Sequence, residues 1–166
     1  AMASLEQNHW VDVHLRGTLH FAYGYHLLFE EQDFDAAAKY ISLSAQNPRA
    51  SLLSKKMSES MSTEQGVIEI GFKVLNDFYK RAKNDEERQT IESKMRRLFL
   101  RKELFELNQL FDQYLHRTDA KLIPKPRAFA LFLRSINHRG HNSVGQKLKL
   151  NEIGQIVVGE NNEDKK

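Results

Sequence analysis

The chain has 166 residues, no cysteine and a formal net charge of +3 at pH 7. This length is enough for one domain, or a short array of helical repeats, with a sizeable core. The lack of cysteine excludes disulfides and thiolate metal sites, and no apolar run approaches the roughly 20 residues that a membrane-spanning helix needs. With 40% hydrophobic residues and three prolines, the composition is typical of an ordered, mostly helical protein.

The charge is uneven along the chain. Residues 1–93 carry 10 Lys+Arg against 14 Asp+Glu, whereas residues 94–149 carry 13 against 4. A basic C-terminal half suits an acidic protein partner, an anionic lipid surface or nucleic acid. A solvated helix face is the plainer explanation of the same charges.

The first expected elements are two helices. Residues 19–31, rich in aromatic and aliphatic side chains, predict the first, and Gly17-Thr18 predicts a break or kink before it. The second begins after Asp33, a good N-cap, and ends at Asn47-Pro48. One face of the second helix carries residues at spacings of four and three that allow another helix to come close: Ala37, Ile41 and Ser44. The two helices therefore read as a hairpin.

The order of residues in this hairpin resembles a known repeat. Its first helix holds Phe21, Gly24, Tyr25 and Leu28, and its second reads Asp33-Phe34-x-x-Ala37-x-x-Tyr40-Ile41 before Pro48. A weaker copy follows as Gly66-x-Ile68-x-x-Gly71-x-x-x-Leu75-x-x-Phe78-Tyr79. This order is similar to the tetratricopeptide repeat (TPR). The resemblance implies a short TPR-like helical-hairpin solenoid, of the kind found in bacterial proteins with a helical tail and a C-terminal β-hairpin.

Two more helices are expected before residue 84. The first, about 48–61, is capped by Asn47-Pro48, and its inward residues are expected to be Leu52, Leu53, Met57 and Met61. The second runs from Ser62 or Thr63 to about residue 83, with an apolar side made of Val67, Ile70, Val74, Leu75 and Phe78. Gly66 and Gly71 each cost about 1 kcal/mol relative to alanine inside a helix. Close approach to the helix at 48–61 is the expected reason for both glycines.

A fifth helix is expected to begin at Asn84-Asp85, where a capping residue precedes acidic residues in the first turn. Two apolar stripes follow on opposite sides of the helix: Ile91, Met95 and Leu98, then Leu100, Leu104, Leu107, Phe111 and Tyr114. A straight helix packed on one side cannot bury both stripes. Either neighbours sandwich the helix or it breaks near Arg101-Lys102-Glu103, and we favour the break.

The C-terminal part predicts a small appended structure. Residues 118–127 read as an extended linker with Pro124 and Pro126, followed by a short helix at 128–136. Residues 147–158 alternate between apolar and polar side chains, which predicts a β-hairpin whose turn carries Asn151 and Gly154. The expected organisation is a helical repeat domain at 1–117, a linker, helix and hairpin packed on it at 118–158, and a disordered tail at 159–166.

Residues with catalytic or metal-binding potential are few. No phosphate-binding glycine loop, nucleophile elbow or His-Glu-x-x-His motif is present, so we expect no enzyme, no catalytic residue, no metal site and no cofactor. His138-x-x-His141 has ligand-like spacing but no carboxylates near it in sequence. A basic run also carries two interleaved phenylalanines: Lys94, Arg96, Arg97, Arg101 and Lys102, with Phe99 and Phe105. These phenylalanines fit the apolar stripes at least as well as a nucleic-acid site.

The sequence therefore predicts an all-α, non-enzymatic protein-protein interaction module, a scaffold or adaptor in a bacterial complex. The expected partner is another protein with an acidic segment or face, and self-association is possible. The expected partner-binding residues are Tyr23, His26, Lys55, Lys56, Arg97 and Arg101. The alternative is a binder of nucleic acid or an anionic surface through the basic C-terminal half. A cytoplasmic location is expected, although Ala1-Met2-Ala3 is typical of a cloning remnant and an N-terminal signal or anchor could have preceded it.

Overall fold

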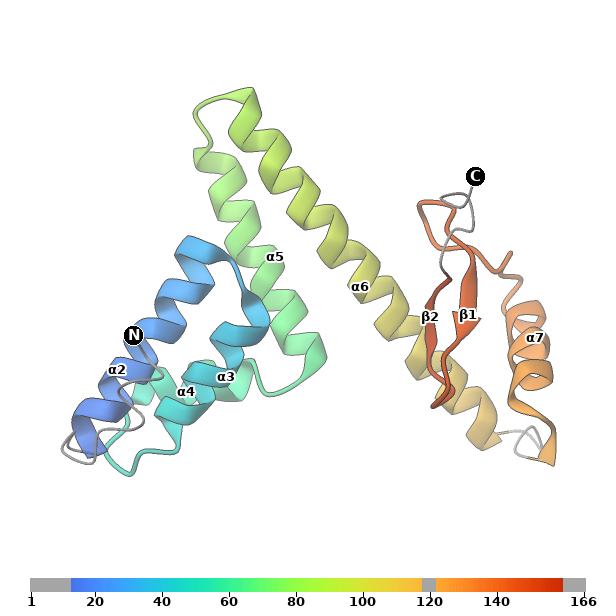
Figure 1. Cartoon of the computed structure of the whole chain (residues 1–166), viewed down its shortest axis with the longest axis horizontal. Coiled ribbons are helices and arrows are strands. Elements are labelled where there is room, and N and C mark those ends of the chain that lie inside the picture. Colours follow the sequence, from blue (N-terminus) through green and yellow to red (C-terminus); the bar gives the residue numbers. More distant parts are fainter. Residues whose placement is uncertain (1–12, 118–121, 160–166) are drawn as a thin grey trace. The chain divides into compact units, whose positions relative to one another are not determined.

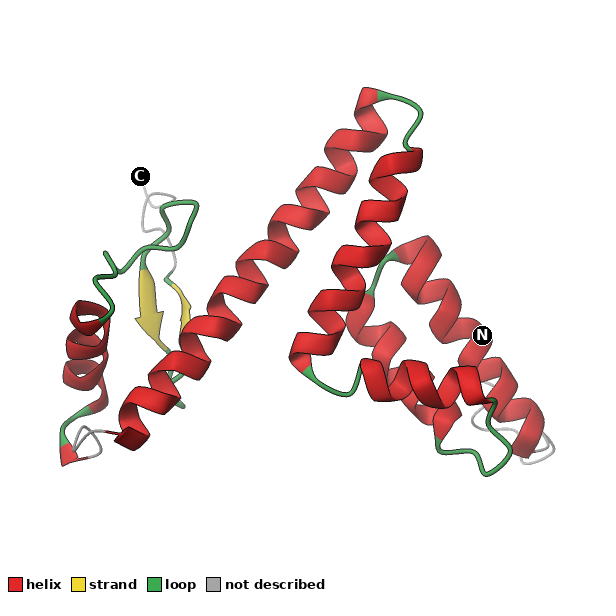
Figure 2. Cartoon of the chain, turned by 180° about the vertical axis from the view of Figure 1, so that it is seen from behind, coloured by secondary structure: helices red, strands yellow, loops and turns green. Residues whose placement is uncertain are grey.

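The computed structural model describes residues 13–117 and 122–159. It is mostly helical, with one small antiparallel hairpin near the C-terminal end, which confirms the predicted all-α class with a β-hairpin (Figures 1 and 2). Predictions for residues 1–12, 118–121 and 160–166 lie outside the described residues. The elements are α2 (Val13–His26), the π-helix η1 (Leu27–Glu31), α3 (Phe34–Ala45), α4 (Leu52–Ser60), α5 (Glu64–Arg81), α6 (Asp85–Arg117), α7 (Lys125–Ser135), β1 (Leu148–Leu150) and β2 (Ile156–Val158).

The chain divides within α6 into two compact units. The first unit ends at Leu98 and the second begins at Phe99. The sequence placed the boundary after residue 117 instead. The difference arises because the second half of α6 shares a core with α7 and the hairpin, in which Leu107, Phe111 and Ile156 are buried.

The first unit is built on the close pairing of α2 and α3. Ala37 and Ile41 are fully buried, and a Cβ on Gly24 of α2 would lie 2.8 Å from Ile41 Cγ1. These contacts confirm the predicted small-residue face of α3. Helix α2 runs without interruption through Gly17, so the predicted break there is wrong. Gly17 serves packing instead, because a Cβ at this position would lie 2.6 Å from Asn47 Nδ2.

Helix α4 starts later than the sequence indicated. Its N-cap is Ser51, whose hydroxyl accepts from Ser54 N at 3.1 Å, rather than Asn47-Pro48. The buried residue of its first turn is Ser54, which donates to Ser44 Oγ of α3 at 3.0 Å. The predicted inward positions of Leu52 and Leu53 are therefore wrong, since these side chains are 68% and 56% exposed.

The two glycines of α5 have different neighbours. A Cβ on Gly66 would overlap the backbone oxygen of Ser60 in α4, which confirms the predicted close approach. A Cβ on Gly71 would instead meet Leu98 of α6 at 2.8 Å and Phe34 of α3 at 3.1 Å. The prediction that Gly71 allows close approach to α4 is therefore wrong.

Helix α6 is one continuous helix of 33 residues, and the predicted break near Arg101-Lys102-Glu103 is wrong. In the first unit its buried residues are Ile91 and Leu98. In the second unit they are Leu107 and Phe111. Each apolar stripe thus belongs to a different core, and the helix needs no break to bury both.

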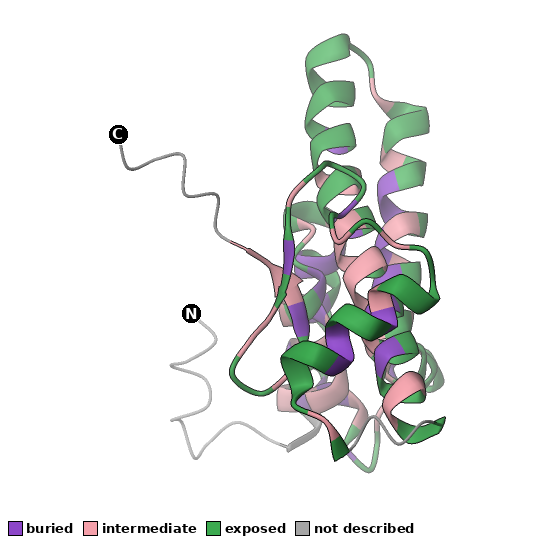
Figure 3. Ribbon diagram, turned by 90° about the vertical axis from the view of Figure 1, so that its right-hand side faces the viewer, coloured by how far each residue is buried: buried purple, intermediate pink, exposed green. Residues whose placement is uncertain are grey.

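The second unit packs α7 and the hairpin on the second half of α6. Helix α7 begins at Lys125, with Pro126 in its first turn, so the predicted extended linker ends earlier than residue 127. One side of α7 is buried and the other exposed (Figure 3). The hairpin is confirmed: Leu148 pairs with Val158 and Leu150 with Ile156.

Two turns of the second unit share one sequence pattern, Asn-x-(Val/Ile)-Gly-Gln, and one geometry. Asn142-Ser-Val-Gly145-Gln and Asn151-Glu-Ile-Gly154-Gln lie nine residues apart. In each turn the Asn side-chain oxygen accepts from the Gln N–H at 2.8 Å and the Asn carbonyl accepts from the Gly N–H at 2.9 Å. Both glycines have positive φ, +84° and +86°, which favours glycine at these positions. The first turn precedes β1 and the second joins β1 to β2.

Candidate functional site

The predicted residues Tyr23 and His26 lie on α2 in a cluster of rings shared with α3. Tyr23 meets Tyr40 of α3 edge-on, with ring centroids 4.8 Å apart and an interplanar angle of 85°. His26 stacks beside Tyr23 at 6.4 Å, and His20 lies 6.0 Å from Tyr40. We call His20, Tyr23, His26 and Tyr40 the tyrosine–histidine cluster.

Helical spacing and the glycine contact assemble this cluster. His20, Tyr23 and His26 follow one another at intervals of three, which places them along one side of α2. The close approach of Gly24 to α3 then brings Tyr40 within reach. His20 is only 8% exposed, Tyr23 and Tyr40 are half-buried, and His26 is exposed. The rings therefore form a continuous path from the core to the surface.

The outer edge of the cluster carries charged groups of both signs. His26 Nε2 lies 3.2 Å from Glu31 Oε1. Lys39 Nζ lies 5.9 Å from the centroid of the Tyr40 ring, within the range of a cation–π contact. The cluster thus offers ring faces that can pack on apolar groups, beside polar atoms that can fix orientation.

The predicted residues Lys55 and Lys56 lie apart from the cluster on α4. Both are exposed, beside the exposed Leu52 and Leu53. Within the described ranges, no hydrogen bond or ring contact joins these lysines to Tyr23. The structure therefore gives α4 its own mixed surface of leucine and lysine and does not merge it with the cluster.

The predicted residues Arg97 and Arg101 lie four positions apart on α6. Arg97 is exposed and Arg101 is half-buried. They fall on different sides of the division at Leu98, so they belong to different units. Arg97 belongs to the same unit as the tyrosine–histidine cluster but is not one of its four members.

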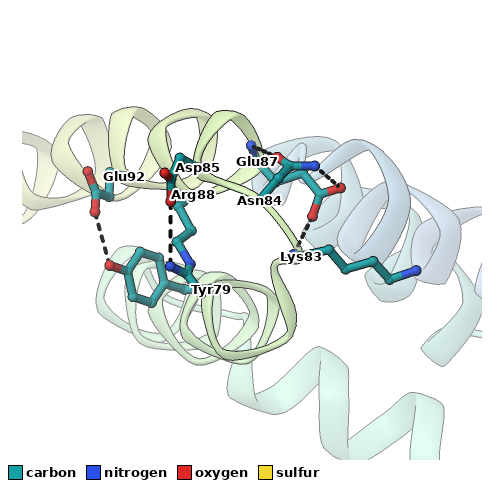
Figure 4. Close-up of polar contacts among 7 residues, drawn as sticks. All are labelled: Tyr79, Lys83, Asn84, Asp85, Glu87, Arg88 and Glu92. Atoms are coloured by element: carbon teal, nitrogen blue, oxygen red, sulfur yellow. Dashed lines mark hydrogen bonds and ion pairs between the residues drawn. The ribbon is translucent and has the colours of Figure 1, made fainter.

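A groove of about 480 Å³ lies beside the turn between α5 and α6. Lys94 Nζ donates to Gln32 Oε1 at 2.6 Å on its lining. Close to the turn, Asn84 caps α6 by accepting from Glu87 N at 2.8 Å, and Tyr79 donates to Glu92 at 3.1 Å (Figure 4). These bonds close the α5–α6 turn and cap the helix, so the polar residues here have a structural explanation.

Among residues 13–117 and 122–159, no set of three or more His, Asp or Glu side chains is close enough to hold a metal ion. His138 Nδ1 accepts from Gly140 N at 3.1 Å, and His141 Nδ1 lies 3.1 Å from the Arg139 carbonyl. Both histidines thus make local backbone contacts. None of the described helices is long and apolar enough to cross a membrane.

Sequence reasoning missed His20 and Tyr40 as members of the cluster. Tyr40 was predicted only as the aromatic residue of the repeat motif, and His20 was assigned no role. The signal was present in the spacing His20, Tyr23, His26, which marks one helix side, but the partner ring depends on how closely α3 approaches. That approach follows from the packing of Gly24 and Ala37.

Comparison of the chain with protein-family models, with curated proteins and with solved structures finds no match.

Proposed function

We propose that the chain is a non-enzymatic protein-binding module, a scaffold or adaptor, and that it docks its partner on the tyrosine–histidine cluster. The observation that carries the proposal is the half-exposed pair of Tyr23 and Tyr40, held edge-on at 4.8 Å. Tyrosine is enriched in interfaces and in their energetic hot spots. Because the rings are already packed together, binding costs little side-chain entropy.

The α2–α3 hairpin supports a TPR-like architecture for this module. Gly24 and Ala37 allow the two helices to approach, as the small residues of such hairpins do. In a solenoid of this type the groove is free to vary while the packing positions are retained. A cytoplasmic location and a bacterial complex are part of the same proposal, and fractionation of the source cell tests the location.

Side-by-side capture from a nuclease-treated lysate of the source cell tests the docking surface. Tyr23→Ala removes the central ring, and Tyr25→Ala removes a 46% exposed tyrosine of the same helix that lies outside the cluster. We expect Tyr23→Ala to raise the Kd of the captured protein at least about tenfold, as truncation of a hot-spot tyrosine does. Tyr25→Ala is the matched control and retains binding.

The other predicted surfaces are tested in the same assay. Charge reversal of Lys55 and Lys56, or of Arg97 and Arg101, abolishes capture of the partner only if those residues form the binding surface. Unchanged binding by Tyr23→Ala, with its helical circular dichroism intact, would contradict the proposal. The alternative function, binding of nucleic acid or an anionic surface, would use the basic C-terminal half of the chain and not the tyrosine–histidine cluster.

A further inference from the structure

The hairpin of the second unit has one buried face and one exposed basic face. Leu148 is buried, whereas its neighbours Lys147 and Lys149 are exposed, as the alternation of a strand requires. His141 stands opposite Lys147, and Val157 stands opposite Lys149. Directly opposed residues share a face. His141, Lys147, Lys149 and Val157 therefore form what we call the outer hairpin face.

The second unit, which carries this face, has an excess of positive charge. Residues 99–117 and 122–159 carry nine Lys+Arg and four Asp+Glu. Two of these acids are engaged elsewhere: Glu103 accepts from Ser143, and Glu106 lies 3.7 Å from Lys102. In the described part of the chain, Lys147 and Lys149 lie within ion-pair distance of no carboxylate. The complementary ligand is therefore anionic.

Each of the two turns, one before β1 and one after it in the chain, exposes one aliphatic side chain to solvent. Val144 and Ile153 occupy equivalent positions and are 47% and 69% exposed. The first turn is fastened to α6, because the Ser143 N–H and hydroxyl donate to Glu103 at 2.9 and 2.8 Å. The second is fastened to α7, because Lys125 Nζ donates to the Ile153 carbonyl at 3.0 Å.

Of the anionic ligands, a lipid surface fits this arrangement best. Lysines are attracted to anionic headgroups, and exposed aliphatic side chains can enter the boundary between headgroups and acyl chains. Single-stranded nucleic acid is bound through aromatic side chains on which bases stack. The outer hairpin face has no phenylalanine, tyrosine or tryptophan and a single histidine ring, His141, while Phe111, Phe129 and Phe132 lie in the core beneath it. We propose that this face, with Val144 and Ile153, binds peripherally to anionic lipid membranes.

Co-sedimentation with vesicles tests the proposal. The full chain is mixed at low salt with vesicles of phosphatidylcholine, with and without phosphatidylserine. We expect binding only when phosphatidylserine is present, and loss of binding as salt screens the charges. The Lys147→Glu/Lys149→Glu variant should lower the apparent partition coefficient by more than about tenfold. Each lysine close to an anionic membrane strengthens binding by roughly fivefold, and the two effects multiply.

A matched control distinguishes binding at the outer hairpin face from a general effect of the protein's net charge. Lys55→Glu/Lys56→Glu on α4 makes the same change in net charge in the other unit, and should keep binding within about twofold of the wild type, because neither lysine belongs to the outer hairpin face. A Val144→Ser/Ile153→Ser variant should weaken binding while leaving its salt dependence intact.

Several results would overturn the proposal. These are no binding to phosphatidylserine vesicles, equal losses in the two lysine variants, or full binding by the Val144→Ser/Ile153→Ser variant. A gel shift of single-stranded nucleic acid that depends on Lys147 and Lys149, without vesicle binding, would assign the face to nucleic acid instead. Circular dichroism of each variant verifies that the fold is retained.

Discussion

Asn108 of α6 acts as a substitute for a neighbouring strand at the edge of β2. Its side-chain amide donates to the Ile156 carbonyl at 3.0 Å and its oxygen accepts from the Ile156 N–H at 2.7 Å. A third bond, from the amide to the Leu104 carbonyl at 2.9 Å, fixes the side chain on its own helix. One residue thus satisfies both outward backbone groups of Ile156.

Replacing Asn108 by alanine should therefore destabilise the second unit. The Asn108→Ala variant leaves a partly buried N–H and C=O of Ile156 unpaired, which costs about 1–2 kcal/mol. Chemical denaturation measures the loss. Gln109→Ala, at an exposed neighbouring position, is the control and should change stability by less than about 0.5 kcal/mol. Equal stability of the two variants would show that Asn108 does not support β2.

The sequence could not reveal this role of Asn108. An asparagine within a helix carries no sign of a strand 48 residues further on, because the contact depends on tertiary packing. By contrast, Asp33 was recognised correctly as an N-cap, and its Oδ1 accepts from Ala36 N at 3.1 Å. Local capping is encoded within a few residues, whereas the cluster of Tyr23 with Tyr40 depends on how closely two helices approach.

At the scale of single elements, Gly66 allows the first turn of α5 to lie close to the end of α4. Alanine is favoured over glycine in a helix by about 1 kcal/mol. A Cβ at this position would nevertheless overlap the Ser60 backbone oxygen, which no side-chain rotation can relieve. We expect Gly66→Ala to lower the free energy of unfolding by about 1–3 kcal/mol, the usual cost of overpacking.

The neighbouring Gln65→Ala variant tests whether this effect is specific. Gln65 is exposed and its side chain donates to Glu69 at 2.9 Å on the helix surface, so its loss should be nearly neutral. Thermal unfolding of both variants gives the comparison. A more stable Gly66→Ala protein would mean that α4 and α5 separate more readily than their contact suggests.

The continuity of α6 can be tested at Lys102, in the middle of the helix. Proline there removes a backbone hydrogen bond and clashes with the preceding turn, so Lys102→Pro should cost about 3 kcal/mol or more and reduce helical circular dichroism. Lys102→Ala should be nearly neutral, because the ion pair with Glu106 is exposed. A tolerated proline would support the broken helix that the sequence suggested.

The sequence failed in α4 and α6 for a common reason. An apolar pattern shows which residues suit burial but not which core receives them. The second stripe of α6 is buried against α7 and the hairpin, and Leu52 and Leu53 stay exposed because Ser54 takes the inward position. Hairpin β1–β2 was predictable, since its alternation and its Asn151 and Gly154 turn are local signals.

At the scale of the whole molecule, the two units should lose structure separately. Phe111 is 1% exposed and packs on Phe129 and Phe132 at ring distances of 5.7 and 5.2 Å. Its replacement by alanine should destabilise the second unit by about 3–5 kcal/mol.

Hydrogen exchange followed by mass spectrometry locates that loss in the Phe111→Ala protein. Faster exchange should be confined to residues 99–117 and 122–159, while α2, α3 and α5 keep their protection, because their core is separate. Equal acceleration in α3 would mean that the chain unfolds as one cooperative block. Leu110→Ala is the control, since Leu110 is 46% exposed.

The division within α6 also has a consequence for synthesis on the ribosome. The contacts of the first unit are complete once Leu98 has left the exit tunnel. Domains made first tend to fold first during translation. The nascent chain then presents a folded unit that ends in an unfinished helix. Residues 99–117 extend this helix turn by turn from a preformed end, so they avoid the unfavourable nucleation step that a separate helix would require.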